Sequence, residues 1–143
     1  MPHMRLVLDT NVMVAAIRSP AGASAEIIRL SHKRKLRLLA SATLAIEYEA
    51  VCFREEHRNA ASLTALEVGV FLNAIIDLVE PVPIWFLWRP QLRDPEDELV
   101  LEAAVIGRAG AIATFNLRDF APAQNRFGVA AMTPREILRT LPP

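Results

Sequence analysis

Several separate segments place acidic or amide side chains where they could bind a metal ion. Asp9 follows directly on the short apolar run Leu6–Leu8, which is typical of a buried strand. Asn116 and Asp119 follow a second such run, at residues 111–115. Ligands of an open parallel sheet bind beyond the carboxyl ends of its strands. We therefore expect Asp9, Asn116 and Asp119 to lie at one edge of a sheet.

Two further acids lie on predicted helices. Glu47 shares a helix face with apolar residues such as Leu44 and Val51, where a carboxylate is costly unless an arginine or a metal ion pairs with it. Asp97 lies about one turn into a helix whose start is marked by Asp94. From that position Asp97 could either cap the helix or project into a cleft.

Oxygen donors from separate segments are the ligands that Mg²⁺ and Mn²⁺ prefer, and Mg²⁺ usually keeps several waters beside one or two carboxylates. Carboxylates gathered without a cation repel one another, which raises their pKa values. Ordinary structural roles are open as well. Asp9 or Thr10 could serve simply as a helix cap, and Asn116 and Asp119 could simply stabilise a turn. We assign Asp94 to helix capping alone.

The elements that must position these residues alternate between strands and helices. Strands are predicted at residues 5–8, 36–41, 111–115 and 128–132, and an extended segment at 81–90. Helices are predicted at residues 12–18, at 25–35 with Ser24 as the cap, from 41 onward, and at 62–80, 94–110 and 133–141. Short apolar strands between helices are typical of a parallel sheet. The expected fold is one α/β/α sandwich over residues 1–143 with a mostly parallel central sheet.

Composition excludes several classes of protein. Hydrophobic residues make up 52% of the 143 residues and charged ones 22%, so a disordered chain is excluded. The formal net charge is zero, which argues against bulk electrostatic binding of nucleic acid. Cys52 is the only cysteine, so neither an internal disulfide nor a cysteine-based zinc site can form. No apolar stretch is long enough for a membrane span or a signal peptide, and we expect a cytoplasmic protein without membrane contact.

The order and spacing of four motifs resemble the PIN-domain family, and within it the bacterial toxins of toxin–antitoxin pairs. The motifs are LDTNV, EYEAV, DPEDELVLEAA and TFNLRDF, and MTPREIL resembles the family's last strand and helix. The resemblance implies a Rossmann-like sandwich and a ribonuclease that depends on Mg²⁺ or Mn²⁺. It also implies frequent homodimerisation, and inhibition by an antitoxin whose peptide blocks the acidic cleft.

The resemblance also implies the site residues. By position, Asp9, Glu47 and Asp97 match the family's three most dependable acids and would act as metal ligands. Asn116 stands where the family often has aspartate, which removes one negative charge. Asp119 is close enough in sequence to replace that charge in part, as a further ligand. In such a site the cation positions the phosphate and activates a water for phosphodiester hydrolysis.

Two other functions are open. The first is a PIN-like module that only binds RNA or protein, for which Asn116 is the main indication. The second is a phosphatase that uses Asp9 as a nucleophile. Such enzymes usually carry a second aspartate two residues later, where this chain has Asn11. Thr10 and Asn11 are expected either to hold the Asp9 loop by hydrogen bonds or simply to begin a helix.

An aromatic segment late in the chain is a candidate contact surface for a second copy. It contains Ile84, Trp85, Phe86 and Trp88. The alternative is ordinary packing in the core.

Overall fold

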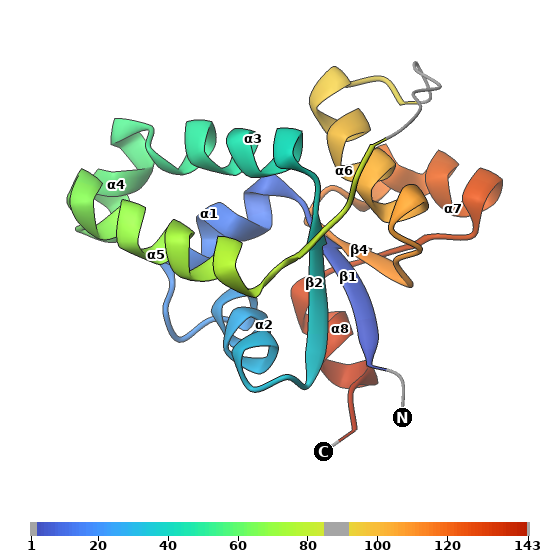
Figure 1. Ribbon diagram of the computed structural model, residues 1–143, viewed down its shortest axis with the longest axis horizontal. Coiled ribbons are helices and arrows are strands. Elements are labelled where there is room, and N and C mark those ends of the chain that lie inside the picture. The colour runs from blue at the N-terminus through green and yellow to red at the C-terminus, as the bar shows by residue number, and fades with distance from the viewer. Residues whose placement is uncertain (1–2, 85–91, 143) are drawn as a thin grey trace.

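The computed structural model describes residues 3–84 and 92–142, which form a central sheet with helices around it (Figure 1). The strands are β1 (Met4–Leu8), β2 (Leu36–Ala40), β3 (Glu80–Pro81), β4 (Ala111–Ala113) and β5 (Ala130–Met132). The helices are α1 (Thr10–Arg18), α2 (Ala23–His32), α3 (Ala42–Cys52), α4 (Glu55–Ala61), α5 (Ala65–Leu78), α6 (Pro95–Ile106), α7 (Ala121–Phe127) and α8 (Pro134–Thr140), with a short 3₁₀ helix η1 (Leu117–Phe120).

The sheet has the strand order β3-β2-β1-β4-β5, and every pair of neighbouring strands is parallel. The chain builds outward from β1 to β2 and β3, and then returns to the other side of β1 to add β4 and β5. The direction in which the chain adds strands therefore reverses between β1 and β4. Open α/β sheets bind ligands at such a switch point. The predicted α/β sandwich with a mostly parallel sheet is confirmed.

The direction of each crossover decides which face of the sheet a helix covers. Crossovers between parallel strands are right-handed, so connections that run in opposite directions along the sheet lie on opposite faces. Helices α1 to α5 connect β1, β2 and β3 in one direction, and α6 and α7 belong to the connections that run the other way. Helix α8 returns to pack against α2, and α6 packs against β1, β2 and β4. The sheet therefore lies between two helical layers (Figure 1).

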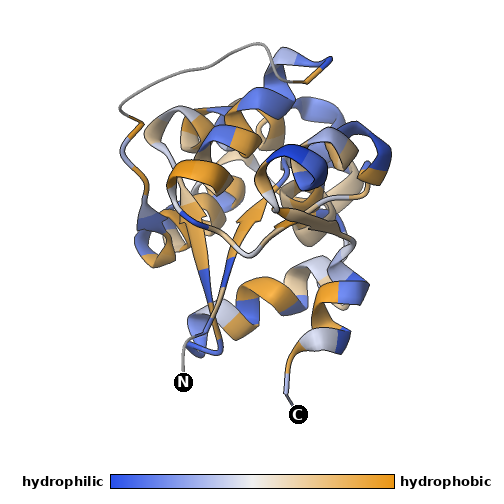
Figure 2. Cartoon of the chain, turned by 90° about the vertical axis from the view of Figure 1, so that its right-hand side faces the viewer, coloured by the Kyte–Doolittle hydropathy of each residue, from blue (hydrophilic) through white to orange (hydrophobic). Residues whose placement is uncertain are grey.

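The strands are apolar because both of their faces are covered. Leu6, Val7 and Leu8 in β1 are at most 2% exposed, and Ala111–Ala113 in β4 are equally buried. Figure 2 shows these strands in hydrophobic colours in the middle of the molecule, while hydrophilic residues gather on the outer sides of the helices. A run of consecutive apolar residues is the pattern expected for strands buried on both faces.

Side-chain caps set the starts of α5, α6 and α8. Thr64 and Glu67 form a complete capping box at α5, Thr133 and Glu136 form another at α8, and Asp94 caps α6 by accepting from the backbone N–H of Glu96. Capping boxes can be recognised in the sequence because both partners lie within four residues of each other.

Two helix predictions were wrong. Gly22, not Ser24, is the N-cap residue of α2, and Ser24 lies buried inside the first turn. Helix α7 follows η1 at residues 121–127, where no helix was predicted. It begins with a proline in its first turn and ends at Gly128, whose φ of 70° requires the left-handed region that glycine adopts most readily.

Among the described residues, no single helix is long and apolar enough to cross a membrane; only α4 and α5 pass that test together, and they are bent by 91°. Of the predicted aromatic contact segment, Ile84 is half-buried. Trp85, Phe86 and Trp88 lie outside the described residues.

Candidate metal centre

Asp9 is fixed between the ends of the two strands that flank the switch point. Its backbone N–H donates to the carbonyl oxygen of Ala113, 2.9 Å away. The hydroxyl of Thr114 donates to Asp9 Oδ2 at 2.7 Å, and the backbone N–H of Thr10 donates to Oδ1 at 2.8 Å. The last contact makes Asp9 the N-cap of α1, as the structural alternative proposed. Because Asp9 is only 4% exposed, it is a buried carboxylate with a fixed orientation.

The pKa of Asp9 is raised above its usual value. Burial is the main cause, because it removes water from around the charged form, and the charge of Asp119 adds a smaller increase. The hydrogen bonds from Thr114 and Thr10 oppose this rise, because they stabilise the carboxylate.

Asp97 lies at the start of α6 and is 7% exposed. Its pKa is raised to about 7; burial is the largest cause, and the negative charges of Asp9, Asp94, Asp119 and Glu96 contribute the rest, in that order of effect. These interactions show that Asp9, Asp97 and Asp119 lie within electrostatic reach of one another, although they come from three different segments.

Asn116 and Asp119 lie on the loop and 3₁₀ helix that follow β4. Both side chains are exposed. The backbone N–H of Asn116 donates to Thr114 Oγ1 at 2.9 Å, and the backbone N–H of Asp119 donates to the carbonyl oxygen of Asn116 at 3.1 Å. Thr114 therefore connects the Asn116 turn to the carboxylate of Asp9 through one hydroxyl group.

Glu47 occupies a half-buried position on α3, and it is not among the charges that raise the pKa of Asp9 or Asp97. The next residue makes the described contact with the site. The buried hydroxyl of Tyr48 donates to the carbonyl oxygen of Leu8 at 2.6 Å, and this holds α3 against the end of β1. The participation of Glu47 in metal binding stays a prediction.

The donor set suits a hard divalent cation that keeps much of its water. Asp9, Asp97 and Asp119 offer carboxylate oxygens, and the raised pKa of Asp97 reports negative charge that a cation would neutralise. Within residues 3–84 and 92–142, however, no three histidine, cysteine, aspartate or glutamate side chains are arranged to hold one ion together. Mg²⁺ needs only one or two direct carboxylates. The chemistry of Asp9 and Asp97 therefore fits such an ion, and Asp119 offers a third carboxylate within electrostatic reach of both.

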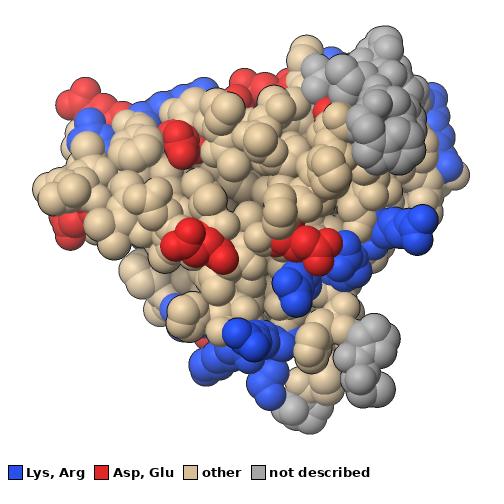
Figure 3. Space-filling model, in the orientation of Figure 1, with Lys and Arg blue, Asp and Glu red and all other residues tan. Residues whose placement is uncertain are grey.

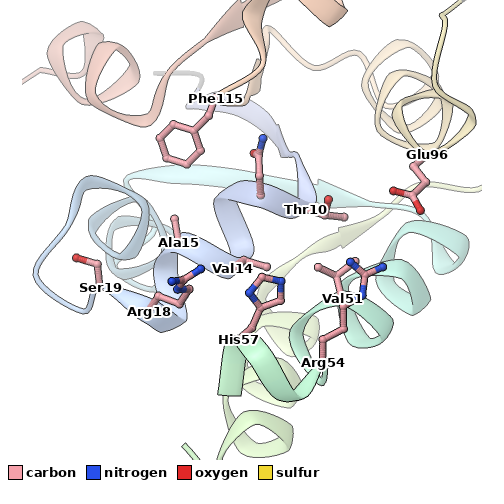
Figure 4. Close-up of a pocket in the computed structure, with 11 residues that line it drawn as sticks. Thr10, Val14, Ala15, Arg18, Ser19, Val51, Arg54, His57, Glu96 and Phe115 are labelled. Atoms are coloured by element: carbon pink, nitrogen blue, oxygen red, sulfur yellow. The ribbon is translucent and has the colours of Figure 1, made fainter. Parts of the chain in front are cut away.

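A cavity of about 580 Å³ is lined by residues of the segments that carry these carboxylates (Figure 4). Its lining includes Thr10, Glu96 and Phe115, which are the chain neighbours of Asp9, Asp97 and Thr114. On its other sides lie the cationic side chains of Arg18 and Arg54. The cavity thus lies between the segments that carry the acids and two arginines, at the end of α1 and the start of α4.

Two residues that line the cavity each have a buried polar atom without a hydrogen-bond partner in the described parts of the chain. The two atoms are Asn11 Oδ1 and His57 Nδ1. Asn11 was expected either to hold the Asp9 loop or to begin a helix; it lies in the first turn of α1, and its carbonyl oxygen makes no bond to that loop.

Sequence reasoning overlooked the positioning role of Tyr48 and the residues of the cavity. A tyrosine on an apolar helix face signals a buried hydroxyl that needs an acceptor, but not which acceptor it finds. The cavity is formed by α1, α3, α4, the start of α6 and the loop after β4, and no local pattern joins these segments.

The fold and the buried carboxylates at its switch point define a class of protein. The PIN domain family model matches residues 5–118, and the chain belongs to that family. The resemblance found in the four sequence motifs is thereby confirmed. The sequence has no match among curated proteins.

A solved structure shares the fold. A chain in the crystal structure of VapBC2 from Rickettsia felis, bound to a DNA fragment from their promoter, superposes with a TM-score of 0.61. The two chains are 15% identical, and the match covers 91% of this chain and 98% of that one. At this identity the similarity shows the fold alone.

Proposed function

We propose that this PIN domain is a metal-dependent endoribonuclease that hydrolyses RNA phosphodiesters, and that it is the toxin of a toxin–antitoxin pair in the cytoplasm. One observation carries the proposal. Asp9, at the switch point of a parallel sheet, and Asp97, at the start of α6, are buried carboxylates within electrostatic reach of each other; burial and their mutual repulsion both disfavour two negative charges, which a cation would neutralise.

The cofactor is Mg²⁺ or Mn²⁺. When bound, it supplies a Lewis acid for the phosphate and lowers the pKa of an attacking water. Asp9 and Asp97 would hold it, Asp119 and Asn116 would add oxygen donors from the loop after β4, and Glu47 would orient water from α3.

The chain's own residues keep these oxygens in place. The Thr114 hydroxyl and the Thr10 amide fix both oxygens of Asp9. Asp97 lies in the first turn of α6, where the positive end of the helix dipole partly stabilises its charge. The carboxylates are therefore oriented before a cation arrives, which reduces the reorganisation that binding requires.

Cleavage of single-stranded RNA by the purified chain tests the proposal. We expect cleavage with Mg²⁺ or Mn²⁺, none with chelator, and loss of cleavage in Asp9→Asn and Asp97→Asn. Asp94→Asn is the matched control, because it removes an equal charge from a neighbouring residue that serves as a helix cap. Equal activity of the wild type and Asp9→Asn would refute the assignment.

We also propose two protein partners. One is a small antitoxin that blocks the acidic cleft, and the other is a second copy of this chain, which forms a homodimer. The structural similarity to a VapBC2 complex supports the antitoxin. Light scattering of the purified chain tests the homodimer. A mass equal to one chain at micromolar concentration would exclude it.

A binding module without catalysis is the second candidate. It is supported by Asn116 in place of an acid, and by the lack of a preformed triad of ligands among the described residues. Asn116→Asp separates the two candidates. If the wild type is an enzyme, the variant should keep its RNA cleavage and bind Mn²⁺ more tightly. If the wild type is an inactive binding module, the wild type should bind RNA without cleaving it, and the variant should either gain cleavage or stay inactive. The buried and doubly hydrogen-bonded Asp9 gives no support to a nucleophilic phosphatase.

A further inference from the structure

A groove runs past the acidic site along α1. The cavity described above shares Ala15, Ser19 and Phe115 with a second hollow of about 400 Å³, which extends to the start of α8. The two hollows are therefore neighbours, with Phe115 in the wall of both. We call them together the α1 groove, which leads from the start of α4, past Glu96 and Thr10, the chain neighbours of Asp97 and Asp9, to α8.

Three arginines line the α1 groove from three different helices. Arg54 caps the start of α4, Arg18 lies at the end of α1, and Arg135 lies in the first turn of α8. All three are exposed, and none makes an ion pair within residues 3–84 and 92–142. An anionic chain laid along the groove would meet a cation at each end and one in the middle.

Phe115 provides an aromatic surface at the junction of the two hollows. Its side chain is 50% exposed, which is unusual for a phenylalanine next to the fully buried Thr114. Figure 4 shows its ring on one side of the cavity, with His57 and Arg54 on the other. Because Thr114 holds the carboxylate of Asp9, a base stacked on Phe115 would lie beside the acidic site.

From this arrangement we infer that the α1 groove binds single-stranded RNA, with one unpaired base stacked on Phe115 and the backbone phosphates near Arg18, Arg54 and Arg135. The inference rests on the proposed function and adds the residues that contact its substrate outside the acidic site. Stacking on an aromatic side chain requires a base outside a duplex, and arginines along a groove contact phosphates without regard to sequence. The groove thus selects unpaired regions.

Binding of a fluorescein-labelled 12-nucleotide RNA, measured by anisotropy in EDTA so that no cleavage occurs, tests the inference. We expect Phe115→Ala to weaken binding roughly tenfold without changing its salt dependence, and Phe115→Trp to restore it. Each of Arg18→Ala, Arg54→Ala and Arg135→Ala should reduce the slope of log K against log salt by about 0.7. A duplex of the same sequence should bind more weakly than the single strand, and Phe115→Ala should not affect it.

Arg37→Ala is the matched control. Arg37 is exposed at the opposite edge of the sheet, beside the turn between α2 and β2, where Lys and Arg side chains gather (Figure 3). Its loss removes the same charge but should leave RNA affinity unchanged. If Arg37→Ala weakens binding as much as Arg54→Ala, the interaction is general electrostatic attraction, and the inference is wrong.

The results separate this inference from the proposed function. Cleavage by the wild type together with normal RNA binding by all groove variants would keep the nuclease and overturn the groove. RNA binding that depends on Phe115, without cleavage under any metal, would keep the groove and overturn the nuclease. Groove variants that bind RNA normally but no longer bind the antitoxin would assign the groove to a protein partner, which also overturns the inference.

Thermal melts of all groove variants should match that of the wild type, because the substituted side chains are exposed.

Discussion

Thr114 is the residue on which the geometry of the site depends most directly. Its side chain is fully buried, and its hydroxyl donates to Asp9 while accepting from the backbone of Asn116. Thr114→Val keeps the shape and removes both hydrogen bonds. We expect a loss of about 1–3 kcal/mol in the free energy of unfolding, a higher pKa for Asp9 and weaker Mn²⁺ binding. Urea unfolding and Mn²⁺ titration measure these effects, and Thr114→Ser, which keeps the hydroxyl, should largely preserve both.

Asp97 makes the stability of the metal-free protein depend on pH. Its pKa rises from 3.8 for the free side chain to about 7 in the fold. Between these values the native state holds a proton that the unfolded state has released, so stability falls as pH rises from about 4 to 7. The loss is on the order of a few kcal/mol.

Urea unfolding in EDTA at pH 5, 6, 7 and 8 measures this dependence. Asp97→Asn cannot titrate and should show a flatter profile, and Mn²⁺ should restore the stability of the wild type at pH 8. A wild-type profile that is identical to that of Asp97→Asn would show that Asp97 is ionised at neutral pH without a cation.

At the scale of elements, the start of α6 combines two functions in adjacent residues. Asp94 caps the helix, whereas Asp97 is buried and interacts electrostatically with Asp9 and Asp119. The two are coupled, because the charge of Asp94 raises the pKa of Asp97. Asp94→Ala should cost about 1 kcal/mol of stability, and Asp94→Asn should cost little because asparagine is an equally good cap. Both should leave RNA cleavage largely intact. Unfolding curves and cleavage rates for the pair check this, and strong loss of cleavage in Asp94→Asn would make Asp94 part of the site.

The sequence predicted those elements whose signals are local. The capping boxes of α5 and α8 and the cap of α6 depend on side chains within four residues of each other. Ser24 misled because a serine in the first turn resembles an N-cap, while Gly22 takes that place without any side-chain bond. The same limit applies to the site: strand ends located Asp9, but the α1 groove depends on how distant helices pack.

For Glu47, periodicity correctly predicted a position beside the core residues of α3, and the structure gives it a half-buried place. Whether its carboxylate reaches the acids depends on the angle between α3 and β1. That angle is fixed by the bond from Tyr48 to Leu8, between residues 40 positions apart, which no pattern within α3 could reveal.

At the scale of the whole molecule, a bound cation should stabilise the fold, because it binds the native arrangement of acids and not the unfolded chain. Mn²⁺ at 100 times its dissociation constant should add about 2.7 kcal/mol to the free energy of unfolding. Thermal melts with and without Mn²⁺ measure the shift, and Asp9→Asn should show little or none. An unchanged melting temperature in the wild type at millimolar Mn²⁺ would count against a metal centre.

The pairing of the first strand with the fourth determines when the site can exist during synthesis. Asp9 leaves the ribosome early, but Thr114, its hydroxyl donor, follows 105 positions later, together with the strand whose carbonyl accepts the N–H of Asp9. Contacts this distant in sequence form late in folding. A nascent chain therefore carries an incomplete site until most of it has been translated. If the chain is the ribonuclease proposed above, this order of synthesis would delay cleavage until the enzyme is nearly complete, while it is still attached to the ribosome and its own messenger RNA.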